Sequence, residues 1–243
     1  METTALRTGA GTWFLASTVI YMFRSADLPM GFIHFLQCSM MMVMTFLGGY
    51  RLYYWVAQGQ IRRRLERGVH AKEFFFHETV VDQWLGFSAS WVYVYSLMFY
   101  GLFGLILLGV RSQADMFGVL ARGLTLAIAH LVFWLFVPTT VPQSLIFLKE
   151  KHRQTAEPPS IAVVLLRLVQ TYDGQNCESI PSMHCSLACF LSLVLYFEQN
   201  RTHPITLCIP LLVAISCIKT KQHVFWDCVT GIVVALAMYP LLN

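Results

Sequence analysis

The sequence is poor in charge. Asp, Glu, Lys and Arg make up only 12% of its 243 residues, whereas 56% are hydrophobic. A soluble domain carries about 25% charged residues, so this composition excludes a water-soluble domain with a charged surface all round. Several uncharged runs approach the roughly 20 residues that cross a bilayer as a helix. We therefore predict an integral membrane protein that crosses the membrane several times.

The sequence also lacks the patterns that indicate metal or nucleic-acid binding. Its seven cysteines form no CxxC pair and no Cys/His ligand spacing, so neither a zinc site nor a disulfide framework is expected. The arginines at 62–67 lie close to apolar runs, where charge that faces the cytoplasm or the lipid headgroups is the better explanation than nucleic-acid binding. No cofactor, metal or nucleic-acid partner is therefore predicted.

The hydrophobic runs predict an all-α membrane bundle, because nothing resembles a strand and the interiors of the runs carry no charge except Arg122, which lies near the start of its run and can extend to the interface. The number of expected spans is six, or seven if the apolar stretch 12–23 also crosses the membrane. Pro138 and Pro142 end one helix before a long polar loop, because proline cannot continue a helix. The six expected spans are 29–50, 84–109, 116–137, 182–198, 204–219 and 227–242.

No second polar block is long enough to fold alone, and no internal repeat is visible. The polar segment 51–83 is expected to lie along the membrane surface. We divide the chain into an N-terminal part at 1–83, with its span or spans and this basic interfacial segment, and a transmembrane core at 84–243.

If the spans alternate in direction, the polar loops 138–181 and 219–227 meet at one face of the membrane, together with the segment 51–83. That face carries most of the 17 Lys and Arg residues, which favours the cytoplasmic side. The ionisable residues gathered there are Lys149, Lys151, Arg153, Asp173, His184, Lys219, Lys221, His223 and Asp227.

Two histidines in this set have the surroundings that phosphoryl transfer needs. His223 and Asp227 are spaced i, i+4, so on a helix they share a face, and the carboxylate would make the far ring nitrogen a better nucleophile. His184 follows Pro181 within the first helical turn, from where it can protonate a leaving oxygen. Ser182 and the free N–H groups of that turn form a phosphate cradle. Lys221, supported by Lys219 or a loop lysine, supplies positive charge.

At these residues the sequence resembles the type 2 phosphatidic-acid phosphatase superfamily of membrane lipid phosphatases and phosphotransferases. The elements that carry the resemblance are Pro-Ser-Met-His at 181–184 and Ser-Cys-x5-His-x3-Asp at 216–227. Tyr-Asp-Gly-Gln-Asn-Cys at 172–177 and the lysine before the second histidine look most like the branch of inositol phosphorylceramide synthase-like enzymes. The resemblance covers roughly residues 80–243 and is strong only around these elements.

The resemblance implies a six-helix bundle with a metal-independent site at one interface, in which residues 84–243 form a phosphatase-like core. It makes His223 the nucleophile, Asp227 its orienting group and His184 the general acid. The implied substrate is a phospholipid, sphingolipid or polyprenyl phosphate, with water or a lipid alcohol as acceptor. The phosphate-binding candidates are Ser182, Lys221, Lys219, Lys149, Lys151 and Arg153, and the supporting candidates are Asp173 and Asn176.

Two departures from the family pattern leave an alternative open. Cys217 and Gln143 stand where phosphate-binding arginines are expected, so the chain could be a catalytically silent relative that serves as a structural or lipid-binding subunit of a membrane complex. A transporter or channel has little support, because no span interior carries a paired charge. His130 is expected to be a hydrogen-bonded packing residue. Glu78 and Asp82 suggest an interfacial ion-pair network more than a second polar site.

Overall fold

The computed structural model describes residues 59, 63, 66, 78–136, 160–172, 180–199 and 203–242. All regular elements in this part of the chain are helical, which confirms the all-α prediction. They are α3 (Val80–Leu85), α4 (Trp91–Gly109), α5 (Gln113–Phe136), α7 (Ile161–Tyr172), α8 (Met183–Leu193), the π-helical turn η2 (Val194–Glu198), the 3-10 helix η3 (Pro204–Cys208), α9 (Ile209–Lys219) and α10 (Phe225–Leu242).

The predicted run 84–109 is divided between two helices. The short helix α3 begins at a capping box in which Thr79 and Asp82 exchange hydrogen bonds, an arrangement that satisfies free N–H groups of the first turn. It ends at Gly86, whose φ of 55° is a left-handed conformation that glycine adopts without strain. The helix α4 starts only at Trp91. Hydrophobicity alone could not reveal this break, because residues on both sides of it are apolar.

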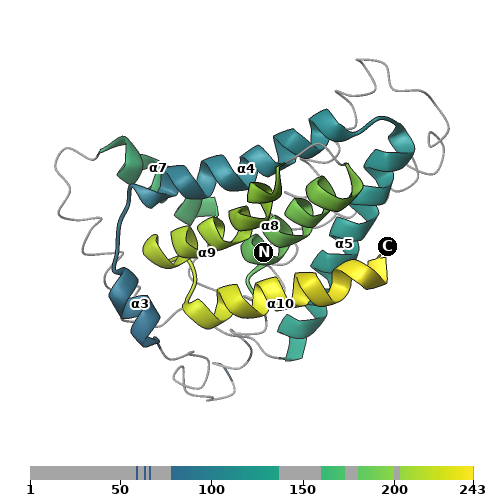
Figure 1. Cartoon of the computed structure of the whole chain (residues 1–243). Coiled ribbons are helices and arrows are strands. Elements are labelled where there is room, and N and C mark those ends of the chain that lie inside the picture. The colour runs from purple at the N-terminus through teal and green to yellow at the C-terminus, as the bar shows by residue number, and fades with distance from the viewer. Residues whose placement is uncertain are drawn as a thin grey trace, which may run out of the picture.

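The helix α8 forms the centre of the bundle, and all of its residues are buried. It packs against α4, α5, α9 and α10, which surround it in the ribbon view (Figure 1). The amphipathic helix α7 packs on α4, where Ala162 and Leu166 bury Val92. The first turn of α8 is therefore enclosed by helices from distant parts of the sequence, and His184 is in that turn.

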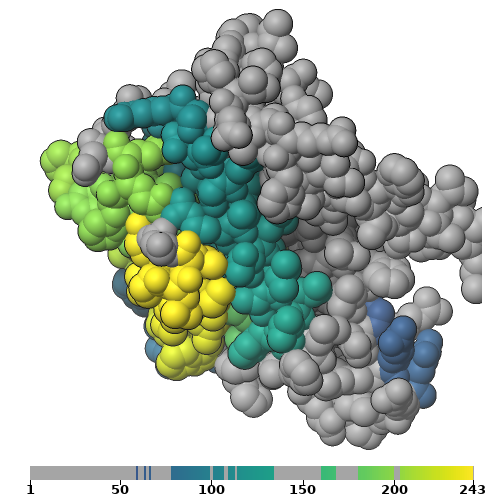
Figure 2. Space-filling view, turned by 90° about the vertical axis from the view of Figure 1, so that its right-hand side faces the viewer, coloured from purple at the N-terminus to yellow at the C-terminus, as the bar shows by residue number. Residues whose placement is uncertain are grey.

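Two helices of the described residues are long and apolar enough to cross a membrane, at Ala114–Phe133 and Phe225–Leu242. They belong to α5 and α10, which lie side by side on one face of the molecule (Figure 2). Shorter apolar helices lie at Trp91–Ile106, Met183–Glu198 and Pro204–Lys219. The predicted spans 29–50 and 12–23 lie outside the described residues, so a bundle of six or seven spans stays a prediction.

The end of the bundle away from His184 is held together by an ion pair. Arg122 on α5 forms two hydrogen bonds of 2.7 Å with the Glu198 carboxylate at the end of η2. The Tyr239 hydroxyl on α10 adds a third contact to Glu198 at 3.2 Å. A bidentate pair of this kind is directional as well as strong, and it joins three elements at one level of the bundle.

Candidate active site

Two histidine rings meet at one end of the bundle. His184 lies in the first turn of α8, and His223 lies in the turn that connects α9 to α10. The Nδ1 atom of His184 is 3.2 Å from the Nε2 atom of His223, and the ring centroids are 5.4 Å apart. Each residue is only 5% exposed. The fold thus brings together two imidazoles that the sequence separates by two helices.

Asp227 lies on the other side of the His223 ring. Its Oδ2 atom is 3.4 Å from Nδ1 of His223 and accepts a hydrogen bond of 3.2 Å from the Val224 N–H. A carboxylate beside Nδ1 favours the tautomer with the hydrogen on that nitrogen, which leaves the lone pair on Nε2. His184 is then the donor in the contact between the two rings. This arrangement can supply a nucleophilic nitrogen and a transferable proton next to each other.

The starts of α8 and α10 are joined through their backbones. Ser182 caps α8 by accepting a hydrogen bond from the Cys185 N–H, and its own N–H donates to the Asp227 carbonyl at 2.9 Å. Gly231 makes this approach possible, because a Cβ atom there would collide with the Ser182 carbonyl oxygen. The buried Ser182 hydroxyl therefore faces its own helix, and its predicted role in phosphate binding stays a prediction.

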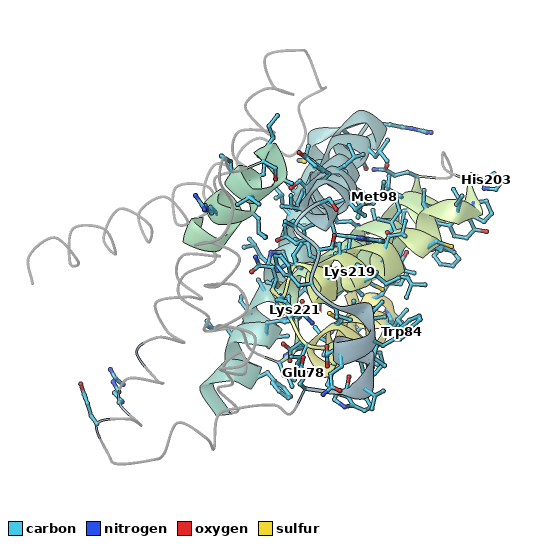
Figure 3. All side chains as sticks on the ribbon, turned by 90° about the vertical axis from the view of Figure 1, so that its left-hand side faces the viewer. Glu78, Trp84, Met98, His203, Lys219 and Lys221 are labelled. Atoms are coloured by element: carbon cyan, nitrogen blue, oxygen red, sulfur yellow. The ribbon has the colours of Figure 1, made fainter. Side chains whose placement is uncertain are left out.

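Both lysines near His223 donate to backbone carbonyls of the α3 segment. The Lys221 ammonium lies 2.7 Å from the Asp82 carbonyl oxygen, and the Lys219 ammonium lies 2.9 Å from the Leu85 carbonyl oxygen. Figure 3 labels both lysines, and Lys221 lies between Lys219 and Glu78 in that view. Burial lowers the pKa of Lys221, while the Glu78 and Asp82 carboxylates oppose the shift. Both ammonium groups are therefore bound to the α3 segment, and the charge of Lys221 is partly compensated by the carboxylates of that segment.

Cys217 is fully buried, at 0% exposure, in the same apolar cluster as Cys185 and Cys228. The position at which the family pattern has a phosphate-binding arginine thus contributes no charge here. Its backbone still serves the site, because the Cys217 carbonyl accepts hydrogen bonds from the N–H groups of Gln222 and His223.

Two residues that the sequence analysis did not assign to the site contact it directly. The buried Tyr95 ring of α4 packs on His184, with ring centroids 5.2 Å apart. Asp82 was expected in an interfacial ion-pair network, but it is 1% exposed and its Oδ1 atom accepts a hydrogen bond of 2.8 Å from the Phe225 N–H. The cap signal at Thr79 and Asp82 was readable in the sequence, whereas the contact with a turn more than a hundred residues away was not.

His130 is a packing residue with hydrogen bonds, as expected. It is fully buried, with Nδ1 2.8 Å from the Leu126 carbonyl oxygen and Nε2 2.7 Å from the Ser186 hydroxyl. Ser186 in turn donates to the Gly231 carbonyl at 2.6 Å. This chain of contacts links α5, α8 and α10 through Ser186, which follows His184 by two residues on α8.

The remaining candidates lie outside the described residues. In the part of the chain that the structure describes, no group of three or more His, Cys, Asp or Glu side chains is arranged to hold a metal ion. The candidates without a described position are Lys149, Lys151, Arg153, Asp173 and Asn176, and the same holds for Gln143, which stands where the family pattern has an arginine.

A family model described as the PAP2 superfamily matches residues 63–241, which is most of the chain. The chain belongs to the PAP2 superfamily. Members of this superfamily are generally phosphatases that act on phosphorylated lipids. Neither the curated proteins nor the solved structures compared with the chain include a match. The superfamily predicted from the two histidine elements is therefore confirmed, and the apolar helices together with this family indicate a membrane protein.

Proposed function

We propose that the chain is a multi-pass membrane enzyme that transfers a phosphoryl or phospho-headgroup from a lipid through a phosphohistidine. The observation that carries this proposal is the 3.2 Å contact between His184 Nδ1 and His223 Nε2, with the Asp227 carboxylate behind the second ring. A nucleophile and an acid within hydrogen-bond reach, with a third group that orients one of them, are the recurring parts of covalent group transfer.

The first chemical step would use both rings. The Nε2 lone pair of His223 attacks phosphorus, so that an N–P bond forms as the bond to the leaving oxygen breaks. His184 takes part as the imidazolium, gives its proton to that oxygen and becomes neutral. An attacking atom lies about 3–3.5 Å from its target before reaction, so a phosphoryl group must separate the two rings on entering. The direct contact between the two rings then describes the protein without substrate, and a bound phosphoryl group would take the place of this contact.

The second step would release the group from His223. Water or a lipid hydroxyl attacks phosphorus, the N–P bond breaks, and the proton of the attacking oxygen returns to His184. Lys221 would stabilise the phosphoryl oxygens during both steps, with Lys219 and the loop residues Lys149, Lys151 and Arg153 in support. Ser182, Asp173 and Asn176 stay proposed contributors. The proposed substrate is a phospholipid, a sphingolipid or a polyprenyl phosphate, and the resemblance to the inositol phosphorylceramide synthase-like branch favours transfer to a lipid alcohol.

The test compares His223→Ala and His184→Ala with the parent enzyme in detergent. Phosphate release from phosphatidic acid and headgroup exchange from phosphatidylinositol to a labelled lipid alcohol are both measured. We expect His223→Ala to abolish turnover and His184→Ala to lower it by about 100- to 10,000-fold, the range of a general acid. His203→Ala is the matched control, because His203 is exposed and caps η3, away from the two site histidines in the sequence. Parental turnover in both site variants would contradict the proposal.

A second candidate function is a catalytically silent lipid-binding subunit. The buried, uncharged Cys217 at the expected arginine position favours it, as do two lysines that already donate to carbonyls. Vanadate forms a covalent adduct with a nucleophilic histidine and therefore separates the two functions. Adduct formation at His223 would exclude the silent subunit, whereas an ordered lipid or partner chain between His184 and His223 would favour it.

A further inference from the structure

Asp82 is a buried carboxylate whose two oxygens face different parts of the chain. One oxygen, Oδ2, caps its own helix α3 by accepting from the Thr79 N–H at 2.8 Å and the Thr79 hydroxyl at 2.7 Å. The other, Oδ1, accepts from the Phe225 N–H at 2.8 Å. Phe225 is the first residue of α10, so this N–H is one of those that a helix start leaves without an intrahelical partner. The carboxylate therefore joins two helix starts from opposite halves of the sequence.

The backbone of Asp82 makes a second link to the same turn. Its carbonyl oxygen accepts from the Lys221 ammonium at 2.7 Å. The two links involve residues 221 and 225, and His223 lies between them. Two further hydrogen bonds join the same segments, from the Lys219 ammonium to Leu85 and from the Ser88 N–H to the Lys219 carbonyl. The segment 82–88 thus holds both ends of the turn that carries the proposed nucleophile.

The turn needs external support. Lys221 has a φ of 56°, a left-handed conformation that is costly for a residue with a side chain. Such residues persist where surrounding contacts hold them, and the Lys221 ammonium is anchored to Asp82. A carboxylate is a strong acceptor for an N–H group, and Asp82 is only 1% exposed, so solvent has little access to replace its partners.

We propose that Asp82 is a positioning residue for His223, acting through its hydrogen bond to the Phe225 N–H and its carbonyl contact with Lys221. The inference rests on the proposed function. Asp82 touches no reacting atom; it sets where the His223 ring stands relative to His184. Because a misplacement of about 1 Å can cost about 100-fold in rate, loss of this support lowers kcat far more than it changes KM.

Kinetics of Asp82 variants test the proposal first. We expect Asp82→Ala to lower kcat by about 10- to 100-fold with KM changed less than about threefold. Asp82→Asn keeps an oxygen that can face Phe225, so it recovers much of the loss. The matched control is Asp115→Ala, because Asp115 also caps a helix start but is exposed and lies on α5. Equal kcat values for Asp82→Ala and Asp115→Ala would overturn the proposal.

A second pair of variants isolates the hydrogen bond and does not require Asp82→Ala to fold. Phe225→Pro removes the N–H donor at the first position of α10, where proline is well tolerated. Phe225→Ala removes the same ring but keeps the donor. We expect Phe225→Pro to lower kcat more than Phe225→Ala, and Asp82→Asn to have no additional effect in the proline background. Equal losses in the proline and alanine variants would contradict the role of this bond.

Chemical modification of His223 does not depend on turnover, so it tests the positioning role of Asp82 separately from the proposed function. Diethyl pyrocarbonate modifies accessible neutral imidazoles, and peptide mass spectrometry reports the rate at His223. We expect a several-fold faster modification in Asp82→Ala than in the parent or Asp115→Ala, while the buried Cys185, Cys217 and Cys228 stay protected from a maleimide. If the parent shows neither turnover nor a vanadate adduct, the proposed function fails and this comparison still decides the positioning role. An unchanged rate at His223 would overturn it.

Discussion

At the scale of single residues, we expect the Asp227 carboxylate to determine which nitrogen of His223 can react. It lies beside Nδ1, which favours the tautomer with the hydrogen on Nδ1 and the lone pair on Nε2, the atom that contacts His184. An amide at the same position would present either a donor or a weaker acceptor. The proposed reactivity of His223 should therefore depend on the charge of Asp227 more than on the volume of its side chain.

We expect Asp227→Asn to lower kcat by roughly 100- to 10,000-fold, because the side-chain NH2 group favours the tautomer with the hydrogen on Nε2. The midpoint of thermal unfolding should shift by only a few degrees, since the new side chain has nearly the same shape. Single-turnover formation of a labelled phosphohistidine measures the effect. A variant with the parental rate of labelling would show that Asp227 does not orient His223.

The proposed role of Lys221 predicts an alkaline limit to activity. Its pKa is lowered by burial, so the positive charge beside the phosphoryl oxygens is lost at a lower pH than for an exposed lysine, whose pKa is about 10.4. We expect kcat/KM to fall as the pH rises through that lowered value. In Lys221→Arg the fall should move to higher pH, because the guanidinium stays charged. An alkaline limb at the same pH in both proteins would assign it to another group.

Stability should respond to Lys221 in the opposite direction. Between the lowered folded pKa and the ordinary unfolded pKa, the unfolded state binds more protons, so this residue makes the free energy of unfolding rise with pH. Thermal unfolding across the same pH series therefore distinguishes loss of charge at the site from loss of the fold.

At the scale of the elements, the distance between α8 and α10 is set by Gly231. We expect Gly231→Ala to destabilise the protein by about 1–3 kcal/mol, the usual cost of overpacking, because the new methyl group collides with the Ser182 carbonyl and comes within 3.2 Å of Cys185. Gly104→Ala is the matched control, since its Cβ meets nothing within 4 Å and alanine favours a helix by up to about 1 kcal/mol. Unfolding in detergent measures both. Equal stability in the two variants would contradict this packing.

At the scale of the whole molecule, two positions near opposite ends of the continuous helix η3–α9 can be labelled chemically to test whether this helix crosses the membrane. Cys208 lies one turn from the start of this helix and is exposed. Gln83 is also exposed and belongs to the segment 82–88, which contacts the other end of the helix through Lys219. If this helix crosses the membrane, an impermeant maleimide added to sealed vesicles labels either Cys208 or a Gln83→Cys variant, but not both. Detergent should make both accessible.

The direction of labelling also tests the side of the membrane on which the site lies. The predicted cytoplasmic site requires that Gln83→Cys reacts in inside-out vesicles and Cys208 in right-side-out vesicles. Labelling of both positions from one side would contradict a membrane crossing by this helix. Peptide mass spectrometry identifies the labelled cysteine in each case.

The sequence by itself determined the helical class, the superfamily and the identity of His184, His223 and Asp227 as candidates, because apolar runs and short motifs are local patterns. It also placed most helix boundaries within a few residues. It did not reveal the break at Gly86, since the flanking residues are apolar and only the backbone conformation ends α3 there.

Only the tertiary structure decided which groups surround the two histidines, His184 and His223. The contact between Asp82 and Phe225 joins segments with no common pattern, the packing of Tyr95 on His184 depends on where α4 lies, and the burial of Cys217 depends on the helices around it. The physical reason is that hydrogen bonds and packing act between atoms that are close in space. A sequence records such neighbours only when they are also close along the chain.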